Sequence, residues 1–229
     1  MDRQPESGGS GLSKMDRIVG GSAAVDDPAA CLAATEFTES DAPAIRELAA
    51  SLRGPTPQAT AVALFDWVRD RIRYDPKAAV DERDAYRATR VLARGSGYCV
   101  QKAILLAALA RAAGIPARLG FADVRNHQSP AWLREVMGTD VFVFHGYVEF
   151  LLGGRWVKAT PAFDEASSRK AGVLPVTLDG TNDAMLHPVD PRGHPYIEYL
   201  RDRGSYLDAP VDEIRREIAE RYAVGRWAP

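Results

Sequence analysis

The chain has few of the features that would place it in a specialised class of protein. Its 229 residues include only two cysteines, Cys31 and Cys99, which are too few for the disulfide framework of a small secreted protein. No apolar run approaches the ~20 residues of a membrane-spanning helix, and the N-terminus lacks the apolar segment of a signal peptide. The net charge of -2 gives no electrostatic reason to expect a nucleic acid. We therefore expect a cytoplasmic protein with neither a nucleic-acid nor a membrane partner.

The composition indicates one folded domain behind a short tail. Hydrophobic residues make up 46% of the chain, which is enough for a single core. Residues 1–26 include a Gly/Ser-rich stretch and are predicted to be a flexible tail. Residues 27–229 are predicted to form one domain, with a core over about residues 60–165 and a Pro- and Gly-rich extension over residues 166–229.

One of the two cysteines begins an apolar helix. Residues 103–110 read AILLAALA, and a helix without a polar stripe is usually buried on all sides. Gly114 and Pro116 end this helix. Cys99 stands at its positive N-terminal end, which favours the nucleophilic thiolate. A lone cysteine is more often an inert core residue, so the prediction of a nucleophile depends on finding a base.

A predicted β-hairpin supplies that base. Two strand-like stretches between about residues 141 and 160 are separated by a Gly-Gly pair, a signal for a two-residue turn. Pairing across this turn places Glu149 opposite Lys158, and such opposite charges support the register. His145 then lies beside Thr160 on the more polar face of the hairpin.

The remaining pattern mixes helices and strands and shows no internal repeat. Helices are predicted over residues 41–52, 57–73 and 210–223, and strands over residues 29–37 and 119–124.

Three residues in this order can carry out thiol chemistry. An imidazole takes the proton of a thiol and later returns it to the leaving group, while a third polar group fixes the imidazole. The order Cys99, His145, Asp164 is also that of papain-like enzymes. Backbone N–H groups at the helix start, including that of Cys99, are candidates for part of an oxyanion hole.

The residues around these positions resemble the transglutaminase-like superfamily. The matching motifs are GYC at 97–99, RAAGIPAR at 111–118, HGYVEF at 145–150 and GRWVKATPAFD at 154–164. The resemblance implies a papain-like α+β fold, in which a central Cys-bearing helix packs on an antiparallel β-sheet. From the sequence pattern we also expect extra N-terminal helices and a C-terminal helix. It also implies acyl transfer through a thioester, with Cys99 and His145 in the family's catalytic roles. The family includes glutamine–lysine cross-linkers, cysteine peptidases, amidases and inactive proteins.

The third member of the triad departs from the family pattern. The family usually has W-x-x-x-D-P-T, which places an aspartate where this chain has Thr160, just before Pro161. Asp164 lies four residues further on. We predict that the chain bends at Pro161 so that Asp164 orients His145, with Thr160 as the alternative orienting group.

Other polar residues near these motifs are weaker candidates. Tyr98 and Gln101 flank the cysteine and are possible pocket residues by position alone. Asn126 and His127 either line the pocket or satisfy backbone groups in a turn, and the turn is the favoured interpretation. No C-x-x-C or H-x-x-x-H spacing indicates a metal site, and we expect no cofactor.

These observations predict a thiol-dependent acyl-transfer enzyme acting on a peptide, a protein or a small amide or acyl substrate. Hydrolysis and transfer to an amine both stay open. Two alternatives remain: an inactive binding or scaffold domain that kept the fold, and a small-molecule amide or acyl transferase in a biosynthetic pathway.

Overall fold

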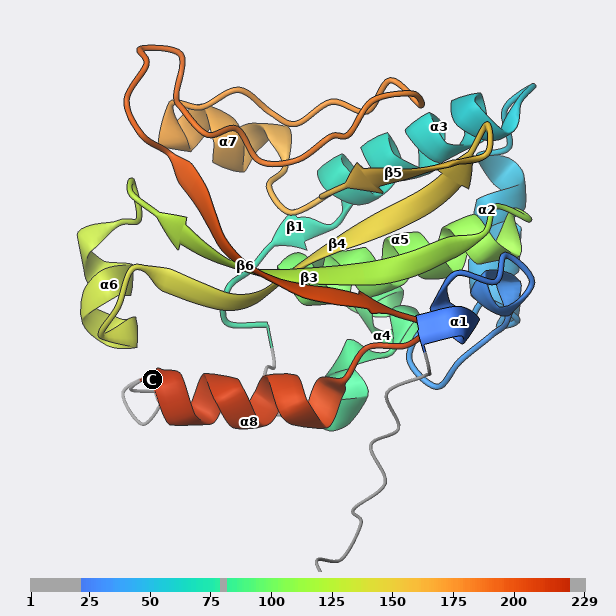
Figure 1. The fold of residues 1–229 in the computed structure, drawn as a ribbon, viewed down its shortest axis with the longest axis horizontal. Coiled ribbons are helices and arrows are strands. Elements are labelled where there is room, and N and C mark those ends of the chain that lie inside the picture. The colour runs from blue at the N-terminus through green and yellow to red at the C-terminus, as the bar shows by residue number, and fades with distance from the viewer. Residues whose placement is uncertain (1–21, 79–81, 223–229) are drawn as a thin grey trace, which may run out of the picture.

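A computed structural model describes residues 22–78 and 82–222 as a mixed α+β fold (Figure 1). A four-stranded antiparallel sheet has the order β5-β4-β3-β6, and a two-stranded parallel sheet pairs β1 with β2. The strands are β1 (Arg73–Tyr74), β2 (Ser96–Gly97), β3 (Ala117–Asn126), β4 (Val141–Leu152), β5 (Arg155–Ala159) and β6 (Ile197–Tyr206). The helices are α1 (Ser22–Val25), α2 (Pro43–Ser51), α3 (Pro57–Arg71), α4 (Ala88–Arg94), α5 (Cys99–Ala112), α6 (Ala131–Met137), α7 (Glu165–Ala171) and α8 (Val211–Arg221), with 3-10 turns η1 (Ala30–Leu32) and η2 (Arg83–Tyr86).

Helix α5 is the centre of the fold, as its sequence predicts. It packs against β4 and β3 of the large sheet, and α2, α3 and α4 pack against it (Figure 1). Even its polar side chains are buried, because they bond to backbone carbonyls. Lys102 Nζ lies 2.9 and 2.6 Å from the carbonyl oxygens of Arg69 and Ile72, at the C-terminal end of α3. The α+β fold with a buried cysteine-bearing helix on an antiparallel sheet is therefore confirmed.

A glycine sets the distance between α5 and the sheet. A Cβ at Gly146 would lie only 2.9 Å from Val100 Cα and 3.3 Å from the carbonyl oxygen of Cys99. No larger residue fits there without moving the strand or the helix. This close approach puts β4 directly on the first turn of α5, so that His145 lies one residue away from the contact.

The predicted hairpin forms with the predicted register. Glu149 pairs with Lys158 across β4 and β5, and Lys158 Nζ lies 3.8 Å from Glu149 Oε1. Arg118 from β3 also bonds to Glu149, which explains how this carboxylate is buried.

Two N-terminal predictions differ from the structure. The predicted strand over residues 29–37 is instead the 3-10 turn η1, where the Asp27 carboxylate accepts a hydrogen bond from Ala29 N at 3.0 Å. Of the predicted tail over residues 1–26, residues 1–21 lie outside the described residues. The rest is folded: α1 begins at Ser22, and Arg118 pairs with Asp26.

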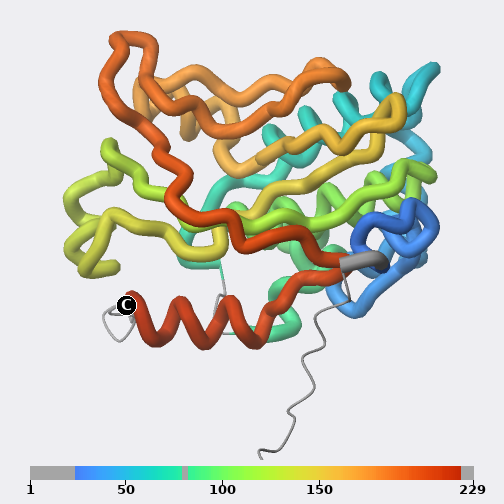
Figure 2. Tube along the Cα trace, viewed as in Figure 1, coloured from blue at the N-terminus to red at the C-terminus, as the bar shows by residue number. Residues whose placement is uncertain are grey.

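The C-terminal extension contributes to both faces of the domain. Strand β6 completes the large sheet at its β3 edge, and α8 then follows (Figure 2). Within residues 22–78 and 82–222, no helix combines the length and the apolar character that crossing a membrane requires.

Candidate active site

Cys99 is the first residue of α5, directly after the extended residue Tyr98. The neighbouring Gln101 fixes this turn. Its Oε1 accepts a hydrogen bond from Tyr98 N at 3.2 Å, and its Nε2 donates to the carbonyl oxygens of Ala78 and Ala85 at 2.9 and 3.1 Å. Gln101 is fully buried and holds the helix start in place, and it is not among the residues that line the pocket at Cys99.

Burial and backbone dipoles act on the Cys99 thiol in opposite directions. Burial raises the pKa of Cys99 to about 11, and the backbone N–H groups of Gly146, Val100 and Cys99 itself lower it. Burial is the larger effect, so the thiol is protonated at neutral pH. The N–H groups that partly oppose it are donors of the kind that stabilise a thiolate or an oxyanion.

His145 is buried on β4, and its ring is held from one side. Its Nε2 lies 3.1 Å from the hydroxyl oxygen of Thr160, and its ring contacts that of Tyr199 edge-on at 6.2 Å between centroids. Burial lowers the pKa of His145 to about 4. The imidazole is therefore neutral near pH 7, and the Thr160 hydroxyl engages its Nε2 and not its Nδ1.

The backbone beside His145 is irregular. Phe144 has φ 54°, and the pairing of β4 with β3 shifts register between Ala122 and Val124. Such bulges bend a strand and redirect a side chain, and they are frequent next to active sites. The simple alternation that predicted the hairpin faces does not apply at this point of β4.

Asp164 has a different place from the one predicted. Its Oδ1 accepts a hydrogen bond from Ser167 N at 2.7 Å, and its Oδ2 accepts one from Tyr74 N at 3.0 Å. These bonds make it the N-cap of α7 and connect α7 to β1. After Pro161 the chain leads away to α7, so the prediction that Asp164 orients His145 is corrected in favour of Thr160.

Asn126 and His127 have turn and surface roles. Asn126 Oδ1 accepts a hydrogen bond from Gln128 N at 2.9 Å, and His127 Nε2 lies 3.2 Å from Glu198 Oε2. Neither residue lines the pocket at Cys99. The structure therefore agrees with the favoured interpretation of the sequence, in which these two residues belong to a turn and not to the pocket.

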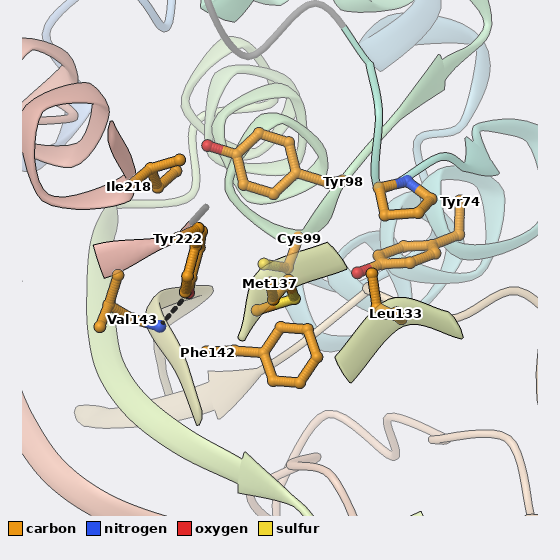
Figure 3. Close-up of a pocket in the computed structure, with 10 residues that line it drawn as sticks. Tyr74, Tyr98, Cys99, Leu133, Met137, Phe142, Val143, Ile218 and Tyr222 are labelled. Atoms are coloured by element: carbon orange, nitrogen blue, oxygen red, sulfur yellow. Dashed lines mark hydrogen bonds between the residues drawn. The ribbon is translucent and has the colours of Figure 1, made fainter. Parts of the chain in front are cut away.

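A pocket opens at Cys99 (Figure 3). The cavity itself has a volume of ≈ 60 Å³, and the wider space around it, which includes open solvent, is ≈ 560 Å³. Its lining comes from β1 and the following loop, from the start of α5, and from α6, β4 and the end of α8. The lining residues are Tyr74, Pro76, Tyr98, Cys99, Leu133, Met137, Phe142, Val143, Ile218 and Tyr222. Tyr98 is the only predicted pocket residue among them besides the cysteine.

Sequence reasoning missed most of this pocket because its lining residues are far apart in the chain. Leu133 and Met137 are spaced four residues apart, so one face of α6 carries both, but nothing in the sequence indicates what that face covers. The Tyr222 hydroxyl accepts a hydrogen bond from Val143 N at 2.7 Å. This bond attaches the end of α8 to β4 beside the cysteine (Figure 3).

Comparison with known proteins identifies a family for most of the region that contains these residues. The sequence model of the transglutaminase-like superfamily matches residues 46–161. A candidate cysteine protease from Cytophaga hutchinsonii is similar in structure, with a TM-score of 0.50 and 19% identity over 82% of this chain and 50% of that chain. The periplasmic domain of TgpA from Pseudomonas aeruginosa matches with a TM-score of 0.42 and 26% identity over 60% of this chain and 48% of that one. The chain thus spans about half the length of these solved structures. No functionally curated protein matches the sequence.

Proposed function

The chain belongs to the transglutaminase-like superfamily, and from this premise we propose that it is a thiol-dependent acyl-transfer enzyme. Cys99 is the nucleophile, and His145 is the general base and then the general acid. The substrate is a peptide, a protein or a small molecule with an amide or ester bond. The matched family region contains both residues.

One observation carries this proposal. The thiol stands at the first turn of a buried helix, in contact with the backbone N–H of Gly146, which directly follows His145. The Thr160 hydroxyl bonds to Nε2 of the His145 imidazole. A thiol, an imidazole and a group that fixes the imidazole are the parts that nucleophilic catalysis by cysteine needs.

The first half-reaction forms a thioester. The thiol proton moves to Nδ1 of His145 as the sulfur attacks the carbonyl carbon, so that a C–S bond forms and the carbonyl oxygen becomes an oxyanion. The N–H groups at the α5 start and at Gly146 stabilise that charge. The oxyanion then collapses, the bond to the leaving amine or alcohol breaks, and His145 gives its proton to that group.

The second half-reaction releases the acyl group. Water attacks the thioester carbon, its proton moves to His145, the C–S bond breaks, and the proton returns to the sulfur. We propose water as the acceptor because it is always present, whereas transfer to an amine requires a site that admits the amine and excludes water.

Hydrolysis of p-nitrophenyl acetate tests this function. We expect release of p-nitrophenol above the buffer rate, loss of that release in Cys99→Ala, and a decrease of about 10²–10⁴-fold in His145→Ala. Arg134→Ala is a matched control, because Arg134 is exposed on α6 outside the pocket lining. Equal rates in the wild type and Cys99→Ala would contradict the proposal.

A second candidate function has a specific observation in its favour. The hydrogen-bond partner of His145 is neutral, and burial keeps the pKa of this residue near 4. An imidazole without a carboxylate partner is weakly basic, as expected of a binding or scaffold domain that lost its activity. The same assay separates the two functions, because such a domain gives the buffer rate in every variant.

A further inference from the structure

We propose that the acyl group transferred by this enzyme is uncharged and apolar, and that it occupies the pocket at Cys99. This inference rests on the proposed function and adds the substrate class. It starts from the position of the thiol, which is itself part of the pocket lining (Figure 3). A group bound in the pocket is therefore adjacent to the sulfur and is the group to which the thioester carbonyl is attached.

Among the residues that the structure describes, the lining of the pocket contains no charged side chain. Apart from Cys99, each of these lining residues is aliphatic, aromatic, methionine or proline. A carboxylate or ammonium in this space would lose its hydration without gaining a partner, which is strongly unfavourable. The pocket therefore selects against charged acyl groups such as those with a terminal carboxylate.

The polar atoms in the pocket are mostly engaged with the protein. The Tyr98 hydroxyl bonds to that of Tyr86 at 2.8 Å, and the Tyr222 hydroxyl accepts from Val143 N. The rings of Tyr98 and Tyr222 line the pocket, while their hydroxyl groups form hydrogen bonds with other parts of the protein. The Tyr74 hydroxyl points toward Cys99 (Figure 3), at the reactive end where a substrate has its carbonyl. The rest of the pocket offers apolar contact.

A cation–π contact joins two of the segments that line the pocket. The Lys77 ammonium lies 5.9 Å from the centre of the Trp132 ring, a cation–π distance. Lys77 directly follows the wall residue Pro76, and Trp132 directly precedes the wall residue Leu133. This contact links the loop after β1 to α6.

A series of p-nitrophenyl esters tests the inference. The series is acetate, butyrate, hexanoate, octanoate and 3-phenylpropanoate, with the mono-p-nitrophenyl ester of adipate as the charged match to hexanoate. In each case the ester C–O bond breaks, p-nitrophenolate leaves, Cys99 carries the acyl group as a thioester, and water releases it as the carboxylic acid. The measured quantity is kcat/KM, divided by the rate constant for alkaline hydrolysis of the same ester.

We expect kcat/KM to rise about fourfold for each added methylene until the pocket is filled, and hexanoate to exceed adipate at least tenfold. A flat series with Cys99-dependent turnover of acetate would overturn the pocket inference and leave the acyl-transfer function standing. Absence of Cys99-dependent turnover with every ester would overturn the proposed function, and the pocket inference with it.

Pocket variants give a second readout. Met137→Ala and Phe142→Ala enlarge the cavity, so we expect the best acyl chain to become longer than in the wild type, whereas Arg134→Ala on the exposed face of α6 keeps the wild-type order. A uniform loss over the whole series would indicate a purely structural effect and would contradict the inference. If these variants fail to fold, the wild-type series alone decides.

Discussion

The hydroxyl oxygen of Thr160 lies 3.1 Å from Nε2 of His145, in the sequence position where the family pattern has an aspartate. The imidazole is thus held in place by a neutral group. A carboxylate in this place would both orient the imidazole and favour its protonated form, whereas the Thr160 hydroxyl can only orient it. Thr160 provides orientation, while no carboxylate among the described residues acts on the pKa of His145, which burial lowers.

Removal of the Thr160 hydroxyl should reduce activity moderately. We expect Thr160→Ala to lower kcat/KM by about five- to tenfold, because one hydrogen bond of about 1 kcal/mol orients the ring. Thr160→Ser keeps the hydroxyl and should stay within about threefold of the wild type. Steady-state kinetics with p-nitrophenyl hexanoate provide the measurement. Equal losses in the alanine and serine variants would show that the methyl group, and not the hydroxyl, is what matters.

A carboxylate at the same position should restore the charge of the family pattern. In Thr160→Asp we expect the pKa of His145 to rise from about 4 toward or above the ordinary value of about 6.5, because a neighbouring anion favours the imidazolium. The rate of thioester formation should rise with it, by about tenfold or more. An NMR titration of the His145 ring checks the first expectation and rapid-mixing kinetics the second. An unchanged pKa would contradict the assigned contact.

Loss of the Asp164 carboxylate should affect stability rather than catalysis. It caps α7 through Ser167 N and connects to β1 through Tyr74 N. Asp164→Ala should therefore lower the free energy of unfolding by about 1 kcal/mol and leave kcat/KM within about threefold of the wild type. Chemical denaturation and ester kinetics on the same preparation provide both numbers. A hundredfold loss of kcat/KM in a well-folded variant would contradict this expectation and would indicate that Asp164 orients His145.

Acid should destabilise the protein through His145. The pKa of this residue is about 4 in the folded chain and about 6.5 when unfolded, so between these values the unfolded state binds more protons. Stability is fully retained above about pH 6.5 and falls as the pH approaches 4, by at most about 3 kcal/mol. We expect this loss, measured by denaturation at each pH, to disappear in His145→Gln. Parallel pH curves for the two proteins would contradict the assignment.

The sequence predicted best what short-range patterns determine. The register of β4 and β5 follows from a two-residue turn and the pair of Glu149 with Lys158, all within one hairpin. The burial of α5 follows from its composition. The family motifs supplied the cysteine, the histidine and the fold class, because each motif is a short run of consecutive residues.

What the sequence did not predict depends on contacts between distant segments. The place of Asp164 follows from the backbone N–H groups of Tyr74 and Ser167, which donate hydrogen bonds to its carboxylate. The sequence around Pro161 does not indicate these bonds. The stretch over residues 29–37 finds no neighbouring strand and forms η1 instead. The pocket is assembled from segments between Tyr74 and Tyr222, and no local motif indicates that they meet.

The most direct test of the account is detection of the acyl-enzyme. The protein is mixed with p-nitrophenyl hexanoate at pH 7.5, quenched in acid within the first turnovers, digested and mapped by mass spectrometry. The account predicts one hexanoyl group on the peptide that contains Cys99, disappearing as hexanoic acid accumulates, and no adduct on that peptide in Cys99→Ala. Release of p-nitrophenol at the wild-type rate without any acyl group on Cys99 would contradict it.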